Sequence, residues 1–184
     1  VYKILKKIKL HKININNFAK LNDLVKKIKP DEVYHLAAQA YDGHSFDNEL
    51  YTFNINLNFT HRILSIVRNV NKKAKFFFAG SSEMYSKNIT KRIDEKTNFD
   101  PKSAYGIAKV ASYYLMKNYR DAFNFSASTG ILFNHESPRK DEQFVLRKIS
   151  TAVAKIKLGL QKKVILGDIK SKREIRFYDE RMKK

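Results

Sequence analysis

Residues 75–83 read KFFFAGSSE, an apolar run that ends in small and polar residues. A short, continuous apolar run is typical of a strand that is buried in a parallel sheet. The predicted strands 33–38 and 125–133 end in the same way, with LAAQ at 36–39 and LFNHE at 132–136. Because ligands bind outside the carboxyl ends of strands in open parallel sheets, the three ends predict one ligand crevice.

Helical patterns separate these strands. Asn16 or Asn17 can cap a helix that Pro30 ends, and Ser103 can cap a later one. Alternation of strand and helix predicts βαβ units, and therefore an α/β fold with a Rossmann-like, doubly wound parallel sheet. We expect helices over about 16–29, 49–70, 103–123 and 141–160, and short additional strands over 8–13 and 164–166.

The composition favours one globular unit with many solvated lysines. A chain of 184 residues can form one good core, and no apolar run approaches the roughly 18–20 residues that a membrane span needs. Lys and Arg number 37 against 18 Asp and Glu, but the excess is mostly Lys spread along the chain. Interleaved aromatics typical of single-strand binding are missing from the basic segments, so a nucleic-acid partner is not expected. The sequence has no secretory signal and no cysteine, which fits a cytoplasmic protein without a membrane partner.

The sharpest local signal is Tyr105-Gly-Ile-Ala-Lys109. A spacing of four residues places the phenol and the ammonium on one face of a helix. A nearby ammonium favours the phenolate and lowers the pKa of a tyrosine, which can then act as an acid and base for a substrate hydroxyl. Ser81, at the end of the preceding predicted strand, can hydrogen-bond the same substrate oxygen.

Ser81, Tyr105 and Lys109, in this order on alternating elements, resemble the catalytic triad of the short-chain dehydrogenase/reductase superfamily. The stretches 36–39 (LAAQ) and 81–83 (SSE) favour its extended, nucleotide-sugar branch. Within that branch the chain resembles the GDP-mannose 4,6-dehydratase family over about residues 8–173. The most specific matches are 130–139 (GILFNHESPR) and 144–149 (FVLRKI), supported by 31–39 (DEVYHLAAQ) and 166–168 (LGD).

This resemblance implies an internal redox cycle that converts GDP-mannose to GDP-4-keto-6-deoxy-mannose with bound NADP. Tyr105 takes the position of the base for the C4 hydroxyl, and Ser81 lies beside that hydroxyl. Lys109 holds the nicotinamide ribose. Glu83 takes the position of the carboxylate that removes the C5 proton and helps the C6 hydroxyl leave. A carboxylate suits this step because the C5 proton becomes acidic once C4 is a ketone.

The resemblance also assigns binding residues and a homo-oligomer that forms through helices beside the active site. Asn14 and Ile15 replace the family's usual Asp-Leu near the adenine, and Lys140 replaces an Arg near the nucleotide. The expected cofactor residues are Asn14, Ile15, Leu36, Ala37, Ala38, Gln39, Ala40, Tyr51, Lys109 and His135. The expected substrate residues are Ser45, Lys140, Lys148 and Arg173, and no metal site is expected.

One family motif is missing from the sequence. No Gly-x-x-Gly-x-x-Gly turn occurs to hold the cofactor pyrophosphate, and it would be expected before Val1. We therefore expect a fragment: residues 1–160 as a partial NADP-binding domain, and 161–184 as the start of a truncated sugar-nucleotide domain. Such a fragment is expected to lack tight cofactor binding and, with it, activity, and to expose a sheet edge that lowers solubility.

Two other functions stay open at this point. Nucleotide-sugar epimerases of the same branch share Ser81, Tyr105 and Lys109 but do not need Glu83, so a Glu83→Gln variant separates them from dehydratases. A non-catalytic, basic Rossmann-like module that binds RNA or a protein would explain the net charge of +19. The intact Ser81, Tyr105 and Lys109 argue against that second alternative.

Overall fold

The computed structural model describes residues 7–40, 48–85, 93–137, 139–167 and 175–177. These residues belong to two compact units, Val1–Ile131 and Leu132–Lys184. Each unit is described by itself. The expected domains, 1–160 and 161–184, refer to the cofactor and sugar-nucleotide parts of a longer fold, and they stay a prediction.

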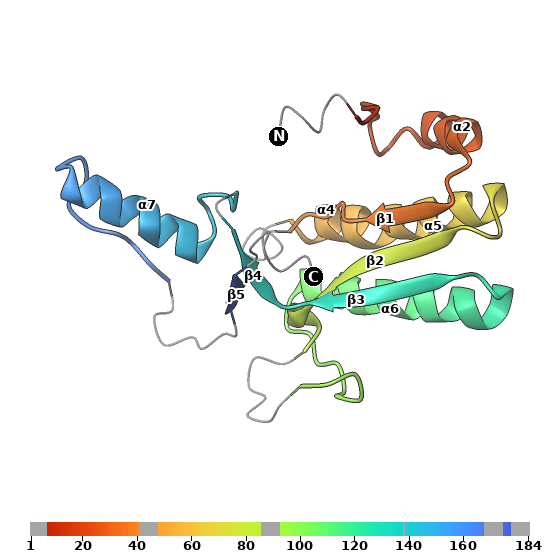
Figure 1. Ribbon diagram of the computed structural model, residues 1–184. Helices are drawn as coiled ribbons and strands as arrows, with labels where there is room; N and C mark the ends of the chain where they lie inside the picture. The colour runs from red at the N-terminus through yellow and green to blue at the C-terminus, as the bar shows by residue number, and fades with distance from the viewer. Residues whose placement is uncertain (1–6, 41–47, 86–92, 138, 168–174, 178–184) are drawn as a thin grey trace. The chain divides into compact units, whose positions relative to one another are not determined.

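A three-stranded sheet in the order β1-β2-β3 forms the centre of the first unit. The strands are β1 (Glu32–His35), β2 (Lys75–Ser81) and β3 (Ala127–Leu132). β1 pairs with β2 in parallel, with Glu32 opposite Lys75 and His35 opposite Phe78. Figure 1 shows all three arrows pointing the same way. The predicted Rossmann-like α/β class with a parallel sheet is therefore confirmed.

Helices connect these strands much as the sequence predicts. Asn17 caps α2 through a bond from the Lys20 N–H to its side chain, and Ser103 caps α6 in the same way through the Gly106 N–H. The helix predicted over 49–70 is interrupted by a π-helical turn, Asn54–Asn58. The helices of the unit are α2 (Phe18–Ile28), α4 (Glu49–Phe53), α5 (Phe59–Val70) and α6 (Ala104–Phe123).

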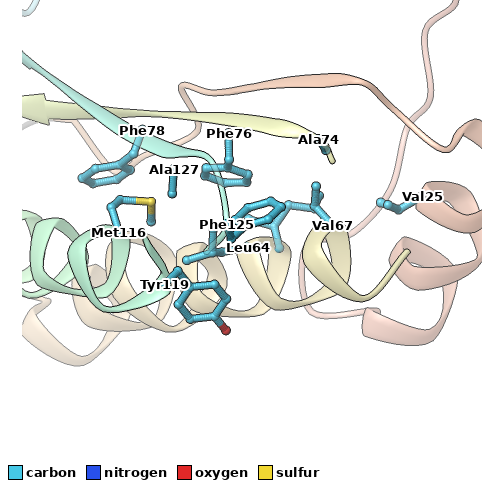
Figure 2. Close-up of a cluster of buried hydrophobic side chains, with 11 residues drawn as sticks. Val25, Leu64, Val67, Ala74, Phe76, Phe78, Met116, Tyr119, Phe125 and Ala127 are labelled. Atoms are coloured by element: carbon cyan, nitrogen blue, oxygen red, sulfur yellow. The ribbon is translucent and has the colours of Figure 1, made fainter. Parts of the chain in front are cut away.

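The core lies between the sheet and the helices on one of its faces. Figure 2 shows Phe76 and Phe78 of β2 directed toward the side chains of α5 and α6. Burying one large apolar side chain contributes about 1.5–3 kcal/mol, so this cluster is the main stabilising contact of the unit. Its members include Val25, Leu64, Val67, Phe76, Phe78, Met116, Tyr119 and Phe125.

The opposite face of the sheet is much less covered by the described residues. Tyr34 of β1 is 66% exposed, while Phe77 of β2 is half-buried. Successive side chains of a strand point to opposite faces, so Phe77 alternates with the fully buried Phe76 and Phe78. The apolar run of β2 therefore has one deeply buried face and one partly open face.

The described residues of the second unit form a short parallel pair of strands and one helix. β4 (Asn134–Glu136) pairs with β5 (Ile175–Phe177), with Asn134 opposite Ile175. Helix α7 spans Val145–Lys157, and the chain leaves it through Gly159 in the left-handed region. The Leu160 N–H bonds to the Lys155 carbonyl at 2.9 Å, which closes the helix end.

Two strand predictions are wrong. The described part of the chain has no strand over 8–13 or over 164–166. Alternating apolar residues indicate a strand only where a neighbouring strand supplies ladder hydrogen bonds, and these segments have no such partner among the described residues. In the same part of the chain, no helix is long and apolar enough to span a membrane.

Candidate active site

Ser81 and Glu83 lie where β2 ends and a single 3₁₀ turn, Ser82–Met84, begins. The Ser81 hydroxyl oxygen accepts the Glu83 backbone N–H at 3.2 Å, and the Tyr85 N–H bonds to the Ser82 carbonyl at 3.0 Å. Both Ser81 and Glu83 are half-buried. The turn therefore holds a hydroxyl and a carboxylate at the carboxyl edge of the sheet.

Tyr105 lies in the first turn of α6, directly beside this 3₁₀ turn. A Cβ added to Gly106 would overlap the Glu83 carbonyl oxygen, so the backbone of α6 contacts the backbone of the turn. The contact requires a residue without a side chain at position 106. It brings the first turn of α6, where Tyr105 precedes Gly106, against the turn that contains Glu83.

Lys109 extends from α6 to the end of β2. Its side chain is buried, with 3% of the residue exposed, and its ammonium donates to the Ala79 carbonyl at 2.8 Å. The nitrogen lies 5.6 Å from the centroid of the Tyr105 ring and 4.8 Å from that of Phe78. Burial lowers the pKa of Lys109 to about 8, so the side chain keeps its charge at neutral pH. A buried cation beside Tyr105 stabilises a negative charge that develops on the phenol.

The sequence did not reveal His35, which is buried near Lys109, with both side chains next to the Phe78 ring. The His35 Nε2 lies 2.8 Å from the Thr60 hydroxyl, and that hydroxyl donates to the Asn56 carbonyl at 2.9 Å. Since the hydroxyl has one proton, His35 is the donor in the first bond and carries its hydrogen on Nε2. Burial, and then the Lys109 charge, lower the pKa of His35 to about 4. The imidazole is therefore neutral at neutral pH.

Asn56 is a second residue that the sequence did not reveal. Its side-chain oxygen accepts the Gln39 N–H at 2.8 Å, and its amide nitrogen donates to the Gln39 carbonyl at 3.1 Å. Its own carbonyl lies in the π-helical turn and accepts the Ser112 hydroxyl at 2.9 Å. The two bonds between Asn56 and Gln39 fix the segment after β1 to the π-helical turn. The one available signal is an Asn inside an apolar helical stripe, where Asn is a poor helix former.

The predicted cofactor residues of the first unit differ in their exposure and in their hydrogen bonds. The segment Leu36–Ala40 follows β1 at the carboxyl edge, and Leu36 is 65% exposed. Tyr51 lies exposed on α4. Asn14 and the half-buried Ile15 precede α2, where the Asn14 side-chain oxygen accepts the Asn16 N–H at 2.9 Å. Asn14 therefore stabilises its own turn.

The second unit contains three of the other predicted residues. His135 is exposed on β4, with its Nδ1 3.0 Å from the Phe133 carbonyl. The Lys140 ammonium donates to the His135 carbonyl at 3.1 Å and lies 3.7 Å from the Glu136 carboxylate. Lys140 is thus engaged inside its own unit, while Lys148 is exposed on α7. Ser45 and Arg173 lie outside the described residues, and the described ones contain no cluster suited to a metal ion.

Several solved structures have the same architecture as this chain. RMD from Pseudomonas aeruginosa, solved in complex with NADPH, has a TM-score of 0.83 at 26% identity and matches 91% of this chain and 58% of its own. A UDP-glucose 4-epimerase from Thermotoga maritima has a TM-score of 0.79 at 20% identity and matches 91% and 54%. The fold that the chain shares with RMD places it in the extended short-chain dehydrogenase/reductase class.

Sequence comparison identifies the family within this class. The GDP-mannose 4,6 dehydratase family model matches residues 2–183, so the chain belongs to the GDP-mannose 4,6-dehydratase family. GDP-mannose 4,6 dehydratase 1 of Arabidopsis thaliana is 41% identical over 92% of this chain and 48% of its own length. The GDP-mannose 4,6-dehydratase of Yersinia enterocolitica is 41% identical over 90% and 45%. The chain thus spans about half the length of the curated relatives that it matches.

Proposed function

We propose that this chain carries the catalytic group of a GDP-mannose 4,6-dehydratase, which converts GDP-mannose to GDP-4-keto-6-deoxy-mannose. The observation that carries the proposal is the position of the buried Lys109 ammonium. It lies between the Ala79 carbonyl and the Tyr105 ring, at the strand end that also bears Ser81 and Glu83. Four groups with complementary chemistry thus surround one strand end, and membership of the family supports their roles.

NADP is the cofactor of this proposal, and the residues at the sheet edge fit its nicotinamide ribose. An ammonium has three N–H donors, and the Ala79 carbonyl accepts one of them, so Lys109 can also donate to ribose hydroxyls. The exposed backbone after β1 offers a surface along which the cofactor can lie. The chemistry that NADP would supply when bound is acceptance of a hydride from sugar C4 and its return to C6.

Tyr105, Ser81 and Lys109 handle the proton of the C4 hydroxyl. The Tyr105 phenolate accepts this proton, while the Ser81 hydroxyl hydrogen-bonds the same oxygen and orients it. The Lys109 charge stabilises the phenolate and, because it is buried, acts with little screening by water. When hydride is returned to C6, C5 takes up one proton, which balances the proton that Tyr105 accepted from the C4 hydroxyl.

Glu83 carries out the elimination. Its carboxylate takes the C5 proton, which is acidic because C4 is now a ketone, and the C5 electron pair forms the C5–C6 double bond. The C6–oxygen bond breaks, and the departing oxygen takes the proton from Glu83 and leaves as water. One carboxyl group can serve both proton transfers because C5 and C6 are adjacent.

The test is product formation from GDP-mannose by the full chain. NADP is supplied in large excess, because the sequence has no Gly-x-x-Gly-x-x-Gly turn to tighten its binding. We expect the ketosugar by mass spectrometry, and its loss in Glu83→Gln and Tyr105→Phe. Glu95→Gln, which changes an exposed carboxylate in the segment before α6, is the matched control.

Two results would contradict the proposal. The first is the absence of ketosugar from the unchanged chain at saturating NADP. The second is an inverted sugar in place of the ketosugar, with Glu83→Gln as active as the parent, which is the behaviour of an epimerase. The homo-oligomer through the helices beside the site and the cytoplasmic location stay predictions.

A further inference from the structure

The Ser82–Met84 turn that presents Glu83 is too short to be rigid by itself. It is one turn of 3₁₀ helix, which has poorer hydrogen-bond geometry than an α-helix. Ser81 belongs to β2 and is held by the sheet, whereas Glu83 lies two residues beyond the strand. The direction of the Glu83 carboxylate therefore depends on contacts from outside the turn.

Helix α6 supports one side of the turn. The Gly106 backbone meets the Glu83 carbonyl, and the fully buried Met84 places its sulfur close to Gly80. The Ser81 N–H points to the same sulfur at 3.5 Å. These contacts fix the inner side of the turn, toward the sheet and the helix.

The segment 93–100 supports the other side. The Asp100 N–H donates to the Met84 carbonyl at 3.0 Å, and the Tyr85 hydroxyl donates to the Asp94 carbonyl at 3.3 Å. The Phe99 ring lies between two tyrosines, with its centroid 5.2 Å from that of Tyr85 and 4.9 Å from that of Tyr113 on α6. The Phe99 and Tyr113 rings meet edge to face, with 75° between their planes, and the Phe99 and Tyr85 rings are tilted by 45°.

We propose that Phe99 is a positioning residue for Glu83. Its ring links the residue that follows the turn, Tyr85, to helix α6, and the next N–H along the chain binds the turn itself. Removing the ring loosens Glu83 before Ser81, because Ser81 is part of the sheet. The elimination step slows while the interactions that bind the sugar nucleotide remain. The catalytic part of this inference rests on the proposed function.

The first experiment measures amide hydrogen exchange by NMR on the full chain, without ligands. Phe99→Ala is expected to speed exchange at the Tyr85 and Asp100 amides about tenfold, with no change at Phe76 in β2. Phe99→Tyr keeps the ring and is expected to restore slow exchange. Phe123→Ala is the matched control, because it removes a half-exposed ring from the far end of α6.

The second experiment follows turnover of GDP-mannose that carries deuterium at C5, with NADP in excess. In Phe99→Ala we expect kcat to fall by up to about 100-fold, an unchanged KM for GDP-mannose and a larger C5 isotope effect. The isotope effect rises because removal of the C5 proton becomes limiting. A variant with merely less folded protein would lose kcat without any change in the isotope effect.

The outcomes separate this inference from the proposed function. Unchanged exchange at Tyr85 and Asp100 in Phe99→Ala overturns the positioning role, as does an equal rise at Phe76. An active Phe99→Ala variant with an unchanged isotope effect also overturns it. If the unchanged chain makes no ketosugar, the proposed function fails, and the exchange data still decide whether Phe99 holds the turn.

Discussion

The two faces of the sheet use neighbouring residues of the same strands in opposite ways. On the helix-covered face Phe76 and Phe78 are almost fully buried, and His35 lies beside them. On the other face Tyr34 is largely exposed and Phe77 is half-buried. Lys109 belongs to the covered face as well, because its ammonium lies over the Phe78 ring. Stability and the proposed chemistry therefore depend on the same layer of side chains.

The largest expected effect is that of Phe78→Ala, on the covered face. It would cost about 3–5 kcal/mol of unfolding free energy, because the side chain is fully buried and its removal leaves a cavity. Phe77→Ala, one residue away on the open face, is expected to cost about 1 kcal/mol. Urea unfolding of both variants measures the difference. Equal losses would show that the two faces are equally buried in solution.

Protonation of His35 is expected to weaken the fold in acid. The pKa of His35 is about 4 in the folded chain, against 6.5 for an ordinary histidine, so the unfolded chain binds the proton first as the pH falls. The stability is fully present above pH 6.5 and is lost as the pH falls toward 4, by up to about 3 kcal/mol. Unfolding midpoints across this range measure the loss.

A matched pair of variants isolates the His35 contribution. His35→Gln is expected to flatten the pH dependence between 6.5 and about 5, above the range in which most carboxylates titrate. His61→Gln changes an exposed histidine on α5 and is expected to leave the dependence unchanged. If the pH dependence of stability persists in His35→Gln, it arises from other titratable groups.

Loss of the Asn56 side-chain bonds is expected to have an intermediate effect. Asn56→Leu leaves the Gln39 N–H and carbonyl without these bonds, at a cost of about 1–3 kcal/mol. Asn58→Leu is the control, because Asn58 is exposed in the same turn and its side chain donates to the Asn54 side chain. Faster exchange of the Gln39 amide in Asn56→Leu alone is the expected result. The same change in both variants would contradict the role of Asn56.

The smallest effect is expected on the open face, for Tyr34→Phe. This change removes a hydrogen bond of 2.9 Å to the exposed Glu32 carboxylate and leaves the Glu32–Lys75 ion pair in place. Exposed polar contacts contribute little, because water replaces them. No measurable shift of the urea midpoint is expected, and a clear shift would show that another group covers this face.

The features that the sequence predicts correctly are those that depend on a few neighbouring residues. The apolar run of β2, the Ser103 cap of α6 and the Tyr105–Lys109 spacing are all readable without a fold. The failed strand over 8–13 shows the limit, because a strand exists only with a hydrogen-bonded neighbour.

The remaining features of the site depend on residues that are distant in sequence. The Asn56 side chain binds a backbone 17 residues away, and Lys109 binds the carbonyl of a residue 30 positions earlier. Gly106 matters because the Glu83 carbonyl happens to meet it. The Lys140 ammonium contacts Glu136 and the His135 carbonyl, four and five residues before it, and its binding of the nucleotide stays a prediction. No single-sequence pattern reports such contacts.

The most direct test of the catalytic group is an NMR titration of the Lys109 ammonium in the full chain. The expected pKa of the Lys109 ammonium is about 8, because the nitrogen is buried between the end of β2 and the Tyr105 ring. A value near the ordinary 10.5 would place the ammonium in water, away from Ala79 and Tyr105, and would contradict the proposed site.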